Sequence, residues 1–308
     1  MKLAAVDIGS NAIRFQITKV LEHEDTISFK KLEYVRFPLR LGQDVFKNNE
    51  ISAEKEAKFI KLIQTFKNLF ELYEVDDYIV CATSAMRESK NGKDIVYKVK
   101  YLLGIDIEII DGEKEAELIN KVLFNELNGK TYLHVDVGGG STELNFFENK
   151  KKIASRSFKI GSVRRLGGMD KPEEWHEMKK WIEKHSALVK KPITAVGTGG
   201  NIGKIYELAN VKTRNKQQII SYKKIQEIQH IIQKHNYEDR VNKLMLNPDR
   251  ADVIVPASEI YIAAMKYAKC SKMLVPEVGL KDGLMLMLYE KNKSIGNKNV
   301  ITVNKYAK

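Results

Sequence analysis

Two glycine turns, each entered from an apolar stretch and an acidic residue, constrain the fold of this chain most. Residues 136–143 read DVGGGSTE, with three consecutive glycines between two carboxylates, and residues 7–11 read DIGSN. Glycine loses more backbone entropy on ordering than any other residue, so three in a row suit neither a helix nor a strand interior. Both segments therefore predict a tight turn whose backbone is not covered by side chains and which lies next to an acidic residue.

The repeat of this turn predicts two related domains. LAAVDI precedes the first turn and IRFQITKV follows it, while TYLHVDV precedes the second and TELNFFE follows it. Each set reads as strand, tight turn, strand. Asp136 follows Asp7 by 129 residues, which is too long a period for a solenoid but suits two related domains. With strands and helices alternating elsewhere, the pattern predicts an α/β fold of two similar lobes around a cleft.

The rest of the chain fits this plan. A long amphipathic helix is expected after Ser52, with apolar residues on one face at three- and four-residue steps. Strands are expected at 78–82 and 105–110, with helices from about Lys93 and from near Glu113. The segment ITAVGTGGNIGKIYEL reads as strand, glycine turn and helix, and the remainder of the chain is mostly helical.

Length and composition suit a two-domain globular protein. The 308 residues are 43% hydrophobic and 30% charged, which allows two cores in domains of roughly 120–190 residues. No apolar run reaches the ~18 residues of a membrane span, and Asp7 interrupts the N-terminal apolar stretch, so no membrane partner and a cytoplasmic location are expected. Cys81 and Cys270 are too few for a disulfide scaffold and read as core residues.

The charge balance favours an anionic partner without naming it. The net charge is +12, from 52 Lys and Arg against 40 Asp and Glu. A basic field attracts polyanions, although a lysine-rich composition with no specific partner explains much of the excess. The basic residues lack interleaved aromatic residues or a nucleic-acid motif, so no specific nucleic-acid partner is predicted.

Tight glycine turns suit phosphate, because their N–H groups can converge on an oxyanion with no Cβ in the way. The candidate phosphate-binding residues are Gly9, Ser10, Asn11, Gly138, Gly139, Gly140, Ser141 and Thr142. The carboxylates of Asp7, Asp136 and Glu143 repel phosphate and suit a hard divalent cation or an attacking water instead. One such turn is more often a plain hairpin, but two after apolar strands favour the phosphate interpretation.

A P-loop is the competing phosphate motif. Gly129-Lys130-Thr131 resembles its end, but the glycine required five positions before Gly129 is Phe124. The P-loop interpretation therefore fails.

With a third glycine turn at Gly197–Gly200, the chain resembles the actin, sugar-kinase and heat-shock ATPase superfamily. Within it, the chain is similar to the exopolyphosphatase and guanosine pentaphosphate phosphohydrolase family. The resembling stretches, in order, are DIGSNAIRF (7–15), LRLGQDV (39–45), ATSAMRES (82–89), IDGEKEA (110–116), DVGGGSTEL (136–144), AVGTGGN (195–201), RADVIVPA (250–257) and GLKDGL (279–284).

The resemblance implies an architecture. It is an α/β fold of two ribonuclease-H-like (actin-like ATPase) domains that face each other across a cleft. The boundaries expected are 1–119 and 120–308, with the final helix a candidate to pack back on the first domain. Longer family members carry a further helical module with a His-Asp pair. None of the six histidines here precedes an aspartate, so the chain resembles the short, two-domain form.

The resemblance also implies roles for single residues. The family's general base falls on Glu115, next to Lys114 where the family has a second glutamate. From position alone, Glu115 is better explained as an acid favoured in the first turn of a helix, and it is the family match that favours the catalytic role. The acids of the family's second phosphate turn fall on Asp136 and Glu143, and its phosphate-binding arginine falls on Arg87, whose fork of donors suits phosphate oxygens.

The activity implied is hydrolysis of the terminal phosphoanhydride of inorganic polyphosphate, releasing orthophosphate, with Mg²⁺ or another divalent cation such as Mn²⁺. A guanosine pentaphosphate 5'-phosphohydrolase is the alternative, since a phosphorylated guanosine nucleotide presents a similar terminal phosphate. A small-molecule kinase of the same fold and a non-catalytic sensor of alarmones or polyphosphate stay open, as does a homodimer. Candidates for a basic polyphosphate groove are Lys159, Arg164, Arg165 and Lys204.

Overall fold

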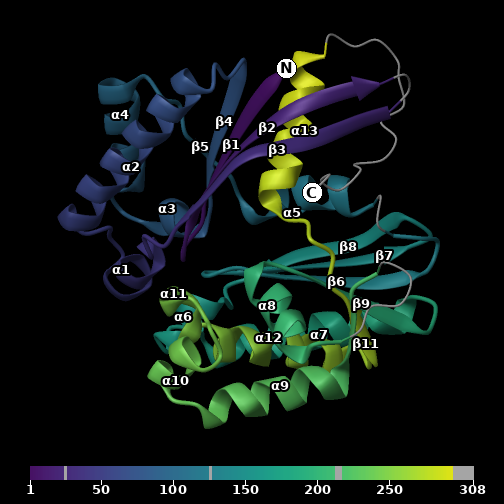
Figure 1. Cartoon of the computed structure of the whole chain (residues 1–308). Coiled ribbons are helices and arrows are strands. Elements are labelled where there is room, and N and C mark those ends of the chain that lie inside the picture. The colour runs from purple at the N-terminus through teal and green to yellow at the C-terminus, as the bar shows by residue number, and fades with distance from the viewer. Residues whose placement is uncertain (24–25, 125–126, 212–216, 294–308) are drawn as a thin grey trace. The chain divides into compact units, whose positions relative to one another are not determined.

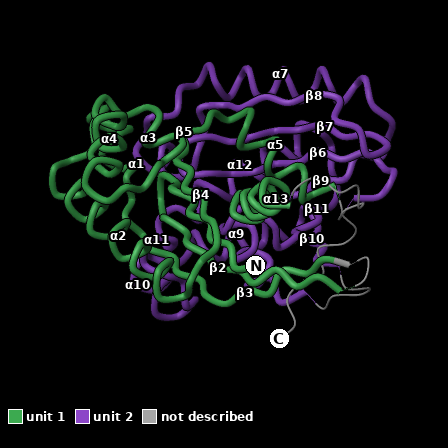
Figure 2. The backbone as a smooth tube through the Cα atoms, turned by 90° about the horizontal axis from the view of Figure 1, so that it is seen from above, with its two compact units in different colours: residues 1–125, 279–308 green, residues 126–278 purple. Residues whose placement is uncertain are grey.

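The computed structural model describes residues 1–23, 26–124, 127–211 and 217–293 (Figure 1). The chain forms two compact units, coloured separately in Figure 2: Met1–Asn125 with Gly279–Lys308, and Glu126–Val278. Each unit has one mixed β-sheet with helices, so the fold class is α/β with two domains. Within the described ranges, no helix combines the length and the hydropathy needed to cross a bilayer.

The first unit contains a five-stranded sheet in the order β3-β2-β1-β4-β5. Its strands are β1 (Lys2–Ile8), β2 (Ile13–His23), β3 (Thr26–Phe37), β4 (Asp77–Ala82) and β5 (Glu108–Ile109). β1, β2 and β3 are antiparallel neighbours, whereas β4 is parallel to both β1 and β5. The first glycine turn is the tight connection between β1 and β2, as the sequence predicts.

The first unit also contains helices. They are α1 (Leu41–Asn48), α2 (Ala53–Leu72), α3 (Ser84–Glu88), α4 (Gly92–Leu103), α5 (Gly112–Leu123) and α13 (Leu280–Asn292). The Ser52 side chain caps α2, and Phe66 of this helix stacks on Phe15 of β2, with ring centroids 4.6 Å apart. α13 lies against α5 so closely that a Cβ on Gly283 would be 2.2 Å from the Leu118 carbonyl oxygen. The last described helix therefore fixes the position of α5.

The second unit contains a six-stranded sheet in the order β10-β11-β9-β6-β7-β8. Its strands are β6 (Thr131–Val137), β7 (Thr142–Glu148), β8 (Lys151–Phe158), β9 (Ile193–Thr198), β10 (Ile219–Ser221) and β11 (Lys272–Leu274). β6, β7 and β8 are antiparallel neighbours, and β9 is parallel to β6 and β11. These five strands repeat the topology of β1–β5, and β10 adds an antiparallel edge.

One face of this sheet is apolar and the other carries polar side chains. The helices of the unit are α6 (Ser162–Leu166), α7 (Pro172–Leu188), α8 (Gly200–Ala209), α9 (Tyr222–Lys234), α10 (Tyr237–Asn242), α11 (Pro248–Ala251) and α12 (Ile254–Tyr267). Leu133 and Phe146 belong to a core that includes Ile182 of α7 and Ile260 of α12. Because side chains alternate along a strand, His134 and Asp136 of β6 lie on the opposite face from Leu133.

Candidate active site

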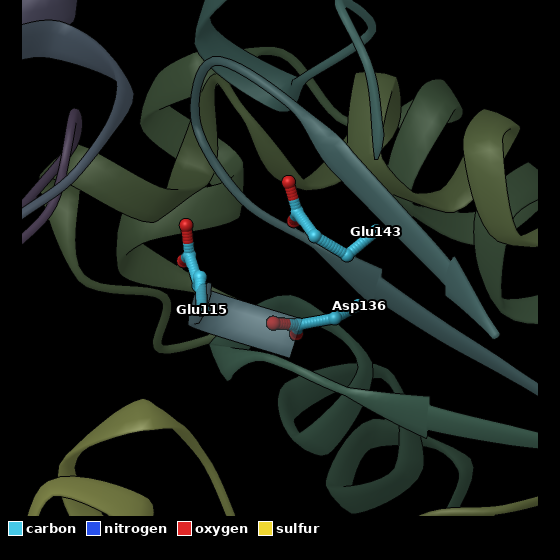
Figure 3. A group of neighbouring side chains, drawn as sticks. All are labelled: Glu115, Asp136 and Glu143. Atoms are coloured by element: carbon cyan, nitrogen blue, oxygen red, sulfur yellow. The ribbon is translucent and has the colours of Figure 1, made fainter. Parts of the chain in front are cut away.

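Asp136 and Glu143 form a carboxylate pair beside the second glycine turn. They are direct cross-strand partners in β6 and β7, and each offers a carboxylate oxygen within 4.8 Å of the other's. Figure 3 shows both side chains extending to the same side of the strands. Asp136 is 9% exposed and Glu143 is 1% exposed. Two carboxylates at this spacing repel each other unless a cation or a shared proton lies between them, and oxygen ligands of this kind fit Mg²⁺ or Mn²⁺.

Short hydrogen bonds hold both carboxylates. The hydroxyls of Ser141 and Ser157 donate to Oε1 of Glu143 over 2.7 and 2.9 Å. The Thr198 hydroxyl donates to Oδ1 of Asp136 over 2.7 Å. Fixing one oxygen of each carboxylate also fixes the direction in which the other oxygen points.

The third glycine turn brings the backbone close to Asp136. Gly199 follows Thr198 and has a φ of 98°, which side chains rarely tolerate. A Cβ at Gly199 would lie 3.3 Å from Oδ1 of Asp136 and 3.1 Å from the Val137 carbonyl oxygen. The turn therefore requires glycine at this position.

The second glycine turn presents its carbonyl groups to α6. The Gly138 carbonyl accepts from the Ser162 N–H, the Gly139 carbonyl accepts from the Val163 N–H, and the Gly140 carbonyl accepts from Nε of Arg164. In a trans peptide the N–H of the next residue points opposite to the carbonyl. The N–H groups of Gly139, Gly140 and Ser141 therefore point away from α6, in an array that suits an oxyanion.

Two hydroxyls that the sequence assigned to phosphate have partners within the second unit. The Thr142 hydroxyl is buried and donates to the Ile160 carbonyl, and the Ser141 hydroxyl donates to Glu143. At these two positions the side chains brace the turn.

The first glycine turn is also held by hydrogen bonds of its backbone, but the acid beside it faces a basic residue. The Ser10 carbonyl accepts from the Gly42 N–H, and the Ser10 hydroxyl lies 2.8 Å from that of Ser84. Gly9 and Asn11 belong to the same turn, and the Asn11 carbonyl accepts from the Arg40 N–H. Asp7 accepts a hydrogen bond from Arg14, its cross-strand partner, over 2.9 Å. The candidate metal ligand of this unit is thus ion-paired.

Arg87 and Glu115 lie in α3 and α5 of the first unit. Nη1 of Arg87 in α3 donates to the Ile110 carbonyl over 2.6 Å, just before α5. Asp111 caps α5, because its side chain accepts from the Lys114 N–H. Glu115, labelled in Figure 3, lies in the first turn of this helix, and its N–H donates to the Asp111 carbonyl.

Most candidates for a basic groove have partners in the second unit. Arg164 is bound to the Gly140 carbonyl, and Arg165 forms ion pairs with Asp170 and Glu259. Lys204 pairs with Glu207 and is only 14% exposed. These three side chains have structural roles that weaken the case for a groove built on them.

Sequence reasoning missed the polar residues around the carboxylate pair. Thr198 and Ser157 contact it directly, and His134, Asn145 and Ser155 continue the hydrogen-bonded network. The available signal was alternation: TYLHVDV and TELNFFE place His134 and Asp136, and Glu143 and Asn145, two positions apart in otherwise buried strands.

Comparison with known proteins gives the family. The model of the Ppx/GppA phosphatase family matches residues 19–292. The chain belongs to this family.

Among curated Ppx/GppA relatives, a guanosine-5'-triphosphate,3'-diphosphate pyrophosphatase of Aliivibrio fischeri is 23% identical over 295 residues. The match covers 91% of this chain and 58% of that protein. A bifunctional 3-dehydroquinate synthase/phosphatase of Fusobacterium nucleatum is 35% identical over 170 residues, which are 52% of this chain and 25% of that protein. The chain thus spans between about a quarter and three-fifths of the length of these relatives.

Solved structures confirm the fold of this family member. The crystal structure of an exopolyphosphatase from Cytophaga hutchinsonii superposes with a TM-score of 0.82 at 20% identity, covering 95% of this chain and 99% of that one. The predicted α/β fold of two actin-like domains and the predicted family are both confirmed.

Proposed function

We propose that this protein hydrolyses the terminal phosphoanhydride bond of inorganic polyphosphate and releases orthophosphate, with Mg²⁺ or Mn²⁺ as cofactor. One observation carries the proposal. Asp136 and Glu143 form a buried carboxylate pair beside a glycine turn whose carbonyls face α6 and whose N–H groups face away from it. Such a turn suits phosphate, and the paired acids suit a cation that accompanies phosphate.

The roles of the residues follow from their chemistry. The N–H groups of Gly139, Gly140 and Ser141 bind oxygens of the terminal phosphate, and the Gly9–Asn11 turn and Arg87 are the proposed donors of the first unit. Asp136 and Glu143 hold the cation, which when bound neutralises charge on the transferred phosphoryl group. Asp7 is kept as a candidate outer ligand.

Glu115 is the proposed general base. A carboxylate can orient a water molecule for in-line attack on the terminal phosphorus and accept its proton. The bond from the water oxygen to phosphorus forms as the bond to the bridging oxygen breaks. The remaining polyphosphate leaves with that oxygen.

Hydrolysis of guanosine pentaphosphate is the second candidate. The observation that favours it is the Aliivibrio fischeri relative, which is named for a guanosine nucleotide and matches 91% of this chain. The partners of Arg164, Arg165 and Lys204 also reduce the basic surface available for a long polyanion. Both substrates offer a terminal anhydride phosphate to the same turns.

Orthophosphate release from each substrate tests the proposal. Long-chain polyphosphate and guanosine pentaphosphate are supplied separately, each with Mg²⁺ and with a chelator. We expect metal-dependent release from polyphosphate. Release from the nucleotide alone would move the function to the second candidate, and release from neither would reject hydrolysis and favour a kinase or a sensor.

A further inference from the structure

A chain of buried polar side chains ends on Asp136. Ser155 donates to Oδ1 of Asn145 over 2.7 Å, and Nδ2 of Asn145 lies 3.1 Å from Nδ1 of His134. Nε2 of His134 lies 2.8 Å from the Thr198 hydroxyl, which donates to Asp136. The side chains come from four neighbouring strands, β8, β7, β6 and β9, and all lie within the second unit.

The donors and acceptors have one consistent direction. Asn145 uses its oxygen for Ser155, so its amide nitrogen donates to Nδ1 of His134. His134 then carries its proton on Nε2 and donates it to Thr198. Because the Thr198 oxygen accepts this bond, its own proton is directed to Oδ1 of Asp136. His134 has no solvent exposure, and the two hydrogen bonds of its ring, one accepted at Nδ1 and one donated from Nε2, agree with a neutral imidazole.

The first unit provides an internal comparison. In the repeated topology, Asp7 corresponds to Asp136, and its neighbour on β4 is Cys81, whereas the neighbour of Asp136 on β9 is Thr198. The residue two positions before Asp7 is Ala5, in the place of His134. The acid of the first unit is instead held by Arg14. The hydrogen-bond relay that runs from Ser155 through Asn145 and His134 to Thr198 thus belongs to the acid whose cross-strand partner is a second acid. The donors of this relay are uncharged.

We propose that His134 and Thr198 are positioning residues that fix the Asp136 carboxylate for binding a divalent cation. This inference rests on the proposed function, because it takes Asp136 as a metal ligand. The uncharged donors hold the carboxylate without cancelling its charge, whereas an arginine in their place would compete with the cation. Residues that orient a metal ligand in this way typically change metal affinity by about 10–100-fold when removed.

Direct binding of Mn²⁺ alone, followed by the electron paramagnetic resonance of the free ion, tests the inference without substrate. Thr198→Val removes the hydroxyl and keeps the shape, while Thr198→Ser keeps the hydroxyl. We expect the valine variant to bind Mn²⁺ about 10-fold or more weakly and the serine variant to bind within about 3-fold of the wild type. Thr194→Val, the same substitution on β9 away from the carboxylates, is the matched control and should bind as the wild type does.

Asp136→Asn separates the two levels of the proposal. If Asp136→Asn binds Mn²⁺ as tightly as the wild type, the proposed metal site itself is wrong. If Asp136→Asn loses binding and Thr198→Val keeps it, the metal site stands and the positioning role is overturned. Circular dichroism checks folding of each variant. Should Thr198→Val not fold, His134→Leu breaks the relay one step earlier and is judged by the same Mn²⁺ affinity, with His134→Gln as the variant that retains a donor.

Discussion

Asp136 lies directly opposite Glu143 in the β6–β7 ladder, at the position where Asp7 lies opposite Arg14 in the β1–β2 ladder. The two halves of the chain thus share the same strand–turn–strand arrangement, but the residue opposite the aspartate is basic in the first half and acidic in the second. In the first half an acid and a base neutralise each other over 2.9 Å. In the second half two acids lie side by side, and this arrangement favours an external cation.

Removing one of these acids should abolish metal-dependent turnover. Asp136→Asn keeps the shape of the side chain but halves the negative charge available to the cation. We expect orthophosphate release to fall by about 10²–10³-fold, since electrostatic stabilisation of the transferred group is the main contribution at such sites. Asp106→Asn, at an exposed ion pair with Lys100, is the control. Equal loss in both variants would contradict a specific role for Asp136.

Glu115→Gln should separate folding from catalysis. The backbone of Glu115 stays within α5, so we expect the variant to unfold at the temperature of the wild type. Loss of the proton acceptor should lower turnover by about 10²–10⁴-fold with a smaller change in KM. Glu113→Gln, an exposed residue of the same helical turn, is the matched control. Turnover unchanged in Glu115→Gln would remove this residue from the mechanism.

The sequence predicts those parts of the fold that depend on short local patterns, such as glycine turns and buried apolar segments. The turns at 7–11 and 136–143 fall between paired strands because glycine and acid patterns report backbone geometry. The strand expected at 105–110 is shorter, with only Glu108–Ile109 in the ladder. Ile105, Ile107 and Ile110 are buried all the same. An apolar pattern reports burial, whereas the length of a strand depends on its partner, and β4 ends at Ala82.

The candidate site could be predicted to the level of carboxylates and glycines. What could not be predicted is which hydroxyl donates to a carboxylate and which donates to the backbone. Ser141 and Thr142 are adjacent and chemically alike, yet one donates to Glu143 and the other to the Ile160 carbonyl. This difference arises because successive residues where the chain enters β7 face opposite sides of the sheet, and distant segments of the chain decide which groups lie on each side.

The glycine preceding α6 should be needed for the second phosphate turn. A Cβ at Gly161 would lie 2.4 Å from the Gly139 carbonyl oxygen, so Gly161→Ala must displace the turn. We expect a raised KM for substrate together with lower turnover. Gly203→Ala in α8 is the control, because nothing lies within 4 Å of the added Cβ. That variant should keep wild-type kinetics and gain about 0.5–1 kcal/mol in stability, since alanine favours a helix. Wild-type KM in Gly161→Ala would contradict the role of this turn in binding.

The ion pair between Asp44 of α1 and Lys55 of α2 should make stability depend on acid pH. Oδ1 of Asp44 lies 2.6 Å from Nζ of Lys55, and both side chains are less than one-fifth exposed. Burial alone raises the pKa of Asp44, but hydrogen bonds from Lys55 and Ser52 outweigh it and hold this pKa below its ordinary value. A lowered pKa in the folded state means that the stabilisation is present above about pH 4 and is lost as the pH falls through the lowered pKa.

Asp44→Asn should therefore lose about 1–2 kcal/mol of unfolding free energy at pH 7, and this difference from the wild type should shrink below pH 4. Urea unfolding at a series of pH values, followed by circular dichroism, measures it. Asp94→Asn in the exposed first turn of α4 is the matched control and should show only a small change. A difference between Asp44→Asn and the wild type that persists unchanged at pH 3 would show that packing of the side chain, rather than its charge, joins α1 to α2. The Gly42 N–H of α1 donates to the Ser10 carbonyl, so α1 supports the first glycine turn. That outcome would therefore also mean that this support does not depend on the charge of Asp44.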